Sequence, residues 1–122
     1  MSRPGPASLP VNLQIDPAQL ARRLRTADGT APALLDVREP EEAAVASLPG
    51  ARLIPLGELG NRLDELDDWR AGAREIVVFC HHGIRSMHAL AILRNQGFER
   101  LLNLRGGIDR WSLDVDPAVP RY

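Results

Sequence analysis

Short apolar runs alternate with helix-forming segments along the whole chain, and this order constrains the fold more than any other feature. The runs predicted as strands are residues 11–15, 32–37, 52–56, 75–79 and 100–104. The segments predicted as helices are residues 17–27, 40–46, 59–69, 87–96 and 106–111. The connections between strands are too long for hairpins and contain helices, so they predict a parallel sheet with helices on both faces. The predicted fold class is therefore α/β.

Local signals support several of these segments. Asp16 and Pro17 are typical of a helix start, and Leu59, Leu63 and Trp69 belong to an apolar series at helical spacing. Residues 1–10 are rich in proline and are predicted to form a flexible N-terminal arm. The rest, residues 11–122, is predicted to be one domain, as the length of 122 residues suggests.

Composition excludes several classes of function. The net charge is -1, and without a basic excess neither nucleic acid nor a membrane surface is an expected partner. The apolar runs are too short to span a bilayer, and no secretory apolar core follows the N-terminus, so a cytoplasmic location is expected. All 15 basic residues are arginine, which excludes Schiff-base and phosphate-loop lysine chemistry. A single cysteine excludes an internal disulfide.

The single cysteine, Cys80, directly follows the apolar run 75–79 and precedes a helix-like segment. A tight loop between a strand and a helix directs backbone N–H groups and the positive end of the helix dipole toward one point, where they stabilise a thiolate or a bound anion. Gly83 permits such a turn, and Arg85 adds a fixed positive charge. These residues together predict an anion cradle around a nucleophile, although position alone fits a buried structural cysteine equally well.

The spacing within this loop separates the possible reactions. Four residues lie between Cys80 and Arg85, one fewer than in the cysteine phosphatases, and the smaller ring fits one sulfur atom on the cysteine better than a phosphate. No Cys-x-x-Cys pair exists for dithiol exchange. A zinc site of Cys80, His81, His82 and His88 is not predicted, because adjacent side chains should diverge and no paired-ligand spacing is present. His81 and His82 are expected at the pocket mouth, with simple solvent exposure equally compatible for His81, and His88 is expected to be structural.

Four stretches in order resemble motifs of the rhodanese-like domain family. They are residues 34–39, 48–56, 80–86 and 106–111. The resemblance covers most of the chain and implies a five-stranded parallel sheet flanked by helices on both faces. One departure lies just before Pro49-Gly50-Ala51, where Ala46, Ser47 and Leu48 replace the Gly-His-Ile of many relatives. The departure predicts altered local packing and a missing scaffold hydrogen bond there.

The resemblance also implies an activity, that of a thiosulfate sulfurtransferase-like enzyme. Sulfur would be carried as a persulfide on Cys80, without a cofactor or metal. The residues implied to bind it are His81, His82, Gly83, Ile84, Arg85 and Ser86. Asp36 and Arg38, at the carboxyl end of the strand 32–37, are implied to brace the loop, and Asp36 alternatively caps a neighbouring turn.

The implied partners are sulfur donors and acceptors. The donor would be thiosulfate or a persulfide-bearing protein, and the acceptor cyanide, a thiol or a sulfur-carrier protein. The tail, residues 115–122, is similar to the end of rhodanese domains attached to sulfur-carrier adenylyltransferases. Two alternatives stay open: a non-catalytic rhodanese-like module that binds a protein through the same cleft and, less favoured, an arsenate reductase or phosphatase.

Overall fold

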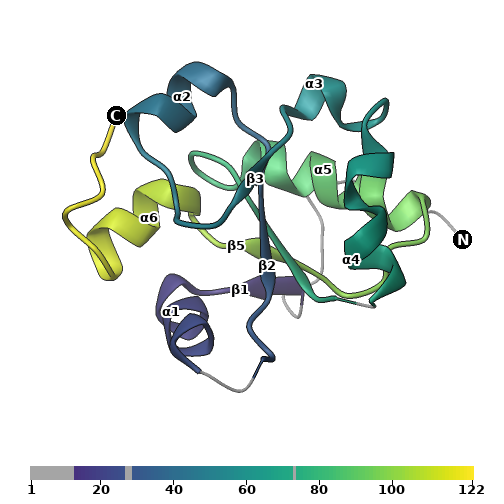
Figure 1. Ribbon diagram of the computed structural model, residues 1–122. Helices are drawn as coiled ribbons and strands as arrows, with labels where there is room; N and C mark the ends of the chain where they lie inside the picture. Colours follow the sequence, from purple (N-terminus) through teal and green to yellow (C-terminus); the bar gives the residue numbers. More distant parts are fainter. Residues whose placement is uncertain (1–12, 27–28, 73) are drawn as a thin grey trace, which may run out of the picture.

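The computed structural model describes residues 13–26, 29–72 and 74–122, so the predicted arm at 1–10 lies outside the described residues (Figure 1). The strands are β1 (Gln14–Ile15), β2 (Ala33–Asp36), β3 (Arg52–Leu53), β4 (Ile76–Phe79) and β5 (Leu101–Leu104). The helices are α1 (Pro17–Arg25), α2 (Pro40–Val45), α3 (Leu56–Leu59), the 3-10 helix η3 (Leu63–Leu66), α4 (Asp67–Ala71), α5 (Ile84–Asn95) and α6 (Gly107–Asp114).

The described strands form one parallel sheet of five strands in the order β1-β5-β4-β2-β3. All residues of β2 and β4 are buried, as expected for strands whose sequences are apolar without alternation. Leu35 of β2 is opposite Val78 of β4, and Val78 is opposite Asn103 of β5. The predicted five-stranded parallel sheet is confirmed, and β4, which ends next to Cys80, is its central strand.

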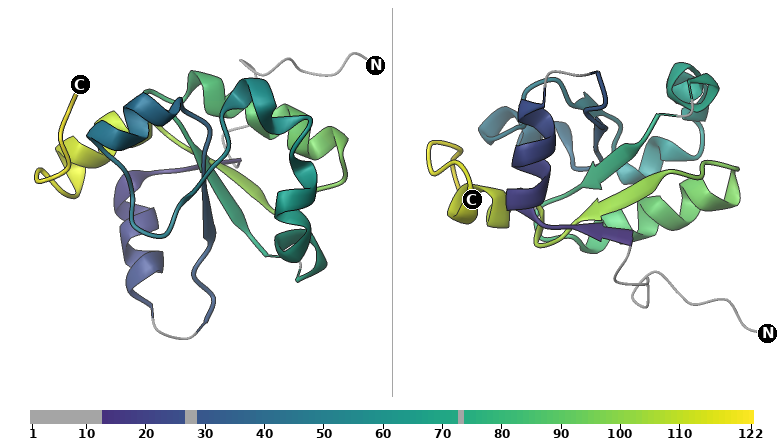
Figure 2. Two further views of the ribbon diagram at one scale, coloured as in Figure 1. Left: turned by 45° about the horizontal axis from the view of Figure 1, so that its top comes forward. Right: turned by 90° about the horizontal axis from the view of Figure 1, so that it is seen from below.

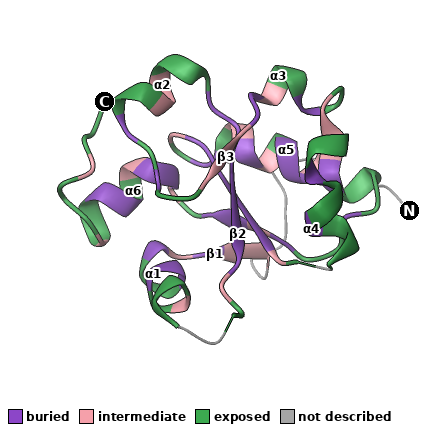
Figure 3. Cartoon of the chain, in the orientation of Figure 1, coloured by how far each residue is buried: buried purple, intermediate pink, exposed green. Residues whose placement is uncertain are grey.

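Helices cover both faces of the sheet, as the two views of Figure 2 show. On one face, Leu35 and Val78 pack with apolar side chains of α3, α4 and α5. On the other face, Val77 and Phe79 pack with apolar side chains of α1 and α6. β2 and β4, the inner strands between these layers, are buried, as Figure 3 shows, and removal of this apolar surface from water is the main favourable term in folding.

The helix starts follow the predicted signals. The backbone N–H of Asp16 donates to Gln19 Oε1 across 2.9 Å, and Pro17 occupies the first position of α1. The same arrangement recurs at α2, where the N–H of Glu39 donates to Glu42 Oε2 across 2.9 Å. These reciprocal contacts satisfy N–H groups that have no partner within the helix.

The single amphipathic helix predicted for residues 59–69 is wrong. This stretch is divided among the end of α3, the 3-10 helix η3 and α4, with a break at Gly60. Glycine has a poor helix propensity, and successive short turns bury side chains at nearly the same spacing as one helix. The burial pattern is therefore kept, since Leu59, Leu66 and Trp69 are all in the core.

Several predicted ends also move. α5 begins at Ile84, before the predicted residue 87, because the left-handed Gly83 already serves as its N-cap. α6 continues to Asp114, past the predicted residue 111. β3 is limited to Arg52–Leu53 at the sheet edge, since Pro55 caps α3 instead of extending the strand.

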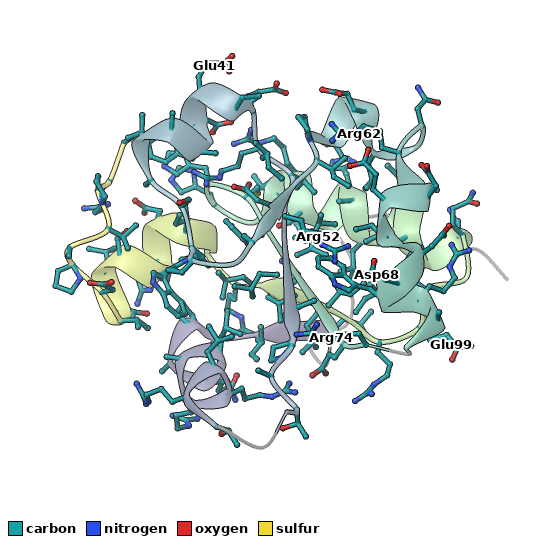
Figure 4. The ribbon with its side chains drawn as sticks, viewed as in Figure 1. Glu41, Arg52, Arg62, Asp68, Arg74 and Glu99 are labelled. Atoms are coloured by element: carbon teal, nitrogen blue, oxygen red, sulfur yellow. The ribbon has the colours of Figure 1, made fainter. Side chains whose placement is uncertain are left out.

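Ion pairs join the edge of the sheet to the helices. The Arg52 guanidinium donates to both carboxylate oxygens of Asp68 in α4, across 2.8 and 2.6 Å, and the two side chains point toward one another in Figure 4. The same guanidinium lies 4.1 Å from the centroid of the Trp69 ring, a favourable cation–π distance. Among the described residues, none of the helices has the length and apolarity required to cross a bilayer.

Candidate active site

The carboxyl end of β4 leads directly into a loop wrapped around the sulfur of Cys80. Cys80 is 1% exposed. Its Sγ accepts hydrogen bonds from the backbone N–H of Gly83 across 3.1 Å and of Ser86 across 3.4 Å. Gly83 has a φ of 103°, in the left-handed region that favours glycine, and this turn directs its N–H at the sulfur. Two of the backbone amides in the predicted cradle, those of Gly83 and Ser86, therefore point at the sulfur.

A buried polar chain continues from the sulfur to β5. Ser86 Oγ lies 3.4 Å from Cys80 Sγ and donates a short hydrogen bond to Asn103 Oδ1. Because the hydroxyl has one hydrogen and gives it to Asn103, its oxygen is left to accept from the thiol. Ser86 and Asn103 are both buried, so this chain fixes the position of the sulfur on the side facing the sheet.

The first residues of α6 form hydrogen bonds to the backbone of the Cys80 loop. The N–H groups of Ile108 and Asp109 donate to the carbonyls of Cys80 and His81, across 2.9 and 3.1 Å. A Cβ on Gly107 would lie 2.4 Å from each of these two carbonyl oxygens, so only glycine allows this approach. The two carbonyls are therefore fixed against the start of α6.

The Arg85 side chain is bound to α2. Its Nη1 and Nη2 donate to Glu42 Oε2 and Oε1 across 2.6 and 2.7 Å, a bidentate pair. The hydrogen bonds from Arg85 are the main cause that lowers the pKa of Glu42 from 4.5 to about 2. Hydrogen bonding to Glu42 raises the pKa of Arg85, and the nearby Cys80 charge acts in the same direction. The arginine predicted to bind an anion is thus already matched by a carboxylate.

Tyr122, at the end of the C-terminal tail, joins this pair. Its hydroxyl accepts from Arg38 Nη1 across 2.8 Å and donates to Glu42 Oε1 across 3.1 Å. Burial raises the pKa of Tyr122 and so favours the protonated phenol. Its ring is stacked on the ring of His81 with 3.9 Å between centroids and 8° between planes. Figure 1 shows the tail passing from α6 to end beside α2.

Asp36 and Arg38 form a buried ion pair behind the loop. Asp36 Oδ1 accepts from the Arg38 backbone N–H across 3.0 Å and from its Nε across 2.9 Å, while Oδ2 accepts from Nη2 across 2.7 Å. The local turn that Asp36 was alternatively expected to cap is therefore present. Arg38 also donates to the carbonyl of Ala46 across 2.7 Å, and Leu48 is buried, so the region of the sequence departure is packed and hydrogen-bonded. The pair connects to the loop through Glu42 and Tyr122.

The histidines do not diverge as expected. The His81 and His82 rings are stacked with 3.9 Å between centroids, and both lie near Asp109. One ligand atom from each of these three residues lies within 4.8 Å of the others, a separation that could hold a metal ion. Arg121 competes for the same carboxylate, because its Nε donates to Asp109 Oδ1 across 2.9 Å. The prediction of no metal stays a prediction. The expected divergence is wrong for His81 and His82, whereas Cys80 and His88 are not part of this group.

The individual histidine predictions had mixed outcomes. Burial is the main cause that lowers the pKa of His81 below 6.5, followed by the charge of His82, and both favour the neutral form of its imidazole. His81 is half-buried, whereas His82 is exposed. His88 is exposed on α5, so the expectation that it is structural finds no support in its position. Ile84 is also exposed and contributes its backbone to the loop.

Sequence reasoning missed four residues that complete the site: Glu42, Asn103, Asp109 and Tyr122. A usable signal existed only for Asn103, a polar residue within the otherwise apolar strand β5. Glu42 was hidden by its evident role in a helix start, and Asp109 and Tyr122 approach the loop only through the fold.

A cavity of about 150 Å³ beside Trp69 and Phe98 adjoins Ile76 and Leu101, the first residues of β4 and β5, and therefore lies at the opposite end of the sheet from Cys80.

Comparison with known proteins agrees with the site. The rhodanese-like domain family matches residues 16–114. A sulfurtransferase of Allochromatium vinosum is 38% identical over 106 residues, which cover 87% of this chain and 94% of that protein. The chloroplastic rhodanese-like/PpiC domain-containing protein 12 of Arabidopsis thaliana is 40% identical over 89 residues, which cover 73% of this chain but only 30% of that protein.

Solved structures give the same result. The human single-domain sulfurtransferase TSTD1 superimposes with a TM-score of 0.68 at 31% identity, covering 84% of this chain and 96% of that one. A rhodanese-related protein of Thermoplasma volcanium gives a TM-score of 0.70 at 30% identity, covering 88% and 94%. With the family match, the sulfurtransferase homologues and the parallel sheet in agreement, the chain belongs to the rhodanese-like domain family.

Proposed function

We propose that the protein is a sulfurtransferase that carries a sulfane sulfur as a persulfide on Cys80. The observation that carries the proposal is the pair of backbone N–H groups, from Gly83 and Ser86, that donate to Cys80 Sγ across 3.1 and 3.4 Å. Amides fixed in this way stabilise negative charge on sulfur without reorganisation during the reaction. The loop amides of His81, His82, Gly83, Ile84, Arg85 and Ser86 form the cradle in this proposal.

The reaction consists of two sulfur transfers. The Cys80 thiolate attacks the outer sulfur of the donor, a new S–S bond forms, and the donor S–S bond breaks with its electron pair on the leaving group, which is sulfite when thiosulfate is the donor. An acceptor nucleophile then attacks the outer sulfur of the persulfide, and the electron pair of that S–S bond returns to Cys80. Each half-reaction is balanced without an external oxidant or reductant.

The surrounding residues have positioning roles in this proposal. Ser86 and Asn103 fix the sulfur from the sheet side, and Ile108 fixes the Cys80 carbonyl against the start of α6. Asp36 and Arg38 brace the loop from behind, through Glu42 and Tyr122. The relatives named sulfurtransferases support the reaction class, while the donor and the acceptor are proposed here from the chemistry of the loop.

A cyanide assay tests the activity. Reduced protein is incubated with thiosulfate, or with a cysteine desulfurase and cysteine, and cyanide is then added. The wild-type protein is expected to form thiocyanate and the Cys80→Ser variant none, since serine cannot hold a sulfane sulfur. The proposal fails if no donor yields thiocyanate. It also fails if Cys80-dependent hydrolysis of an aryl phosphate is the faster reaction, which would favour phosphatase chemistry.

A further inference from the structure

The arginines around the loop are matched by carboxylates. Arg85 is bound in a bidentate pair by Glu42, and Arg38 is bound by Asp36 across 2.7 Å. Arg121, which reaches the loop from the tail, is bound by Asp109 across 2.9 Å. Among the described residues, these pairs leave the cradle without a net excess of arginine charge. The remaining positive potential comes from the start of α5, which Cys80 Sγ itself uses.

Glu42 is held in place by more than its pair with Arg85. Its Oε2 accepts from the Glu39 N–H across 2.9 Å as part of the start of α2. Its Oε1 accepts from the Tyr122 hydroxyl across 3.1 Å, and Tyr122 in turn accepts from the buried Arg38. Release of Arg85 toward a bound anion would break the pair and leave this network with an unmatched carboxylate. Arg85 is therefore committed to Glu42 while the fold is intact.

The possible sulfur donors differ in charge. Thiosulfate is a dianion, whereas an organic thiosulfonate or a persulfide carries a single negative charge at its reacting end. Cys80 adds a further negative charge when it is a thiolate, so a dianion meets the stronger repulsion in a site without an excess cation. A donor with one negative charge meets about half of this electrostatic repulsion from the Cys80 thiolate.

We propose that Glu42 is a specificity-determining residue, which neutralises Arg85 and thereby favours sulfane donors with a single negative charge over the thiosulfate dianion. This inference rests on the proposed sulfur transfer. The donor class it selects is a persulfide or thiosulfonate sulfur at the end of a larger group. The chemical step is the same for each donor, because the outer sulfur moves to Cys80 and the leaving group keeps the electron pair of the broken S–S bond. The leaving group is sulfite from thiosulfate, a sulfinate from a thiosulfonate and a thiolate from a persulfide.

The substitution Glu42→Gln tests the inference. Glutamine has the shape of glutamate and keeps one amide oxygen, which can accept from the Glu39 N–H at the position of Oε2, but it removes the charge that neutralises Arg85. The value of kcat/KM is measured with thiosulfate and with methanethiosulfonate, a monoanion of similar shape, at low ionic strength and saturating cyanide. A dianion responds to one unit of charge about twice as strongly as a monoanion, so kcat/KM should rise about tenfold for thiosulfate and about threefold for methanethiosulfonate.

Glu41→Gln is the matched control, because Glu41 is exposed on the same helix and its substitution removes the same charge without a contact to Arg85. It should leave the ratio of the two kcat/KM values unchanged. An unchanged ratio in Glu42→Gln, with both donors still active, would overturn this inference and leave the proposed function intact. Absence of transfer from both donors in the wild-type protein would overturn both.

The wild-type protein supplies a second measurement that does not depend on how the variant folds. If Arg85 is neutralised, kcat/KM for thiosulfate should stay level or rise between roughly 20 and 200 mM salt, since the salt then screens only the repulsion between the dianion and the Cys80 thiolate. A steep fall with increasing salt would show that a free cation binds the dianion. That result would contradict the role assigned to Glu42.

Discussion

At the scale of single residues, the site depends on two glycines that allow close contacts between backbone segments. Gly83 turns one N–H toward the sulfur, and Gly107 lets α6 touch the carbonyls of Cys80 and His81. Gly107 has a φ of 63°, so a side chain there would meet both a strained backbone and two carbonyl oxygens. The two glycines thus set the direction of the amides and of the carbonyls, respectively.

The substitution Gly107→Ala should therefore disturb the loop. We expect a loss of about 2–4 kcal/mol in the free energy of unfolding, from overpacking and left-handed strain, together with a large loss of transfer rate. Urea denaturation and the cyanide assay measure the two effects. Gly97→Ala is the control, because Gly97 also has a positive φ, 90°, but a Cβ at this position would have no atom within 4 Å. Equal losses of stability and rate in the two variants would contradict the close contact.

At the scale of elements, the sequence predicted the sheet better than the helices. β4 and β2 are apolar and buried on both faces, so their type was evident without any tertiary information. The division of 59–69 into α3, η3 and α4 could not be predicted, because the burial spacing is nearly the same in one helix and in a series of short turns. The early start of α5 depends on the left-handed Gly83, a conformation that sequence permits but does not require.

The ion pair between Glu42 of α2 and Arg85 of the Cys80 loop predicts that the stability of the fold depends on pH. The pKa of Glu42 is lowered from 4.5 to about 2, chiefly by Arg85, so the pair contributes fully above pH 4.5 and its contribution is lost as the pH falls toward about 2. Because the Arg85 side chain is 36% exposed, we expect a contribution on the order of 1–2 kcal/mol. Urea midpoints between about pH 5 and pH 2 should fall more steeply for the wild-type protein than for Glu42→Gln. Identical pH profiles would contradict a stabilising pair.

At the scale of the whole molecule, the C-terminal tail returns to the loop and joins parts that are distant in sequence. Tyr122 contacts Arg38 and Glu42 at the start of α2 and His81 in the Cys80 loop, two segments that are distant from each other in sequence. Local motifs in the sequence indicated Cys80 and its loop, but contacts of this kind depend on the path of the entire chain. For the same reason, no sequence signal indicated that Arg85 would be neutralised by Glu42.

Substitution of Tyr122 measures how much the contacts of the C-terminal tail contribute to the stability of the fold and of the Cys80 loop. Tyr122→Phe keeps the stacking on His81 but loses both hydroxyl contacts, and should reduce the free energy of unfolding by about 1 kcal/mol. Tyr122→Ala loses the stacking as well, and should also speed amide hydrogen exchange in residues 80–86. Leu113→Ala is the control, since Leu113 is an exposed apolar residue of α6. Exchange in the loop that is the same in Tyr122→Ala and Leu113→Ala would show that the tail does not hold it.

The central claim is that Cys80 carries the transferred sulfur, and an intact mass measurement tests it most directly. After a single exposure of the reduced protein to a sulfane donor and removal of the excess, the wild-type mass should increase by about 32 Da, one sulfur atom. Peptide mapping should place the increase on Cys80, and cyanide should remove it with one equivalent of thiocyanate. A mass that stays unchanged with every donor, or an adduct that cyanide cannot remove, would contradict the account.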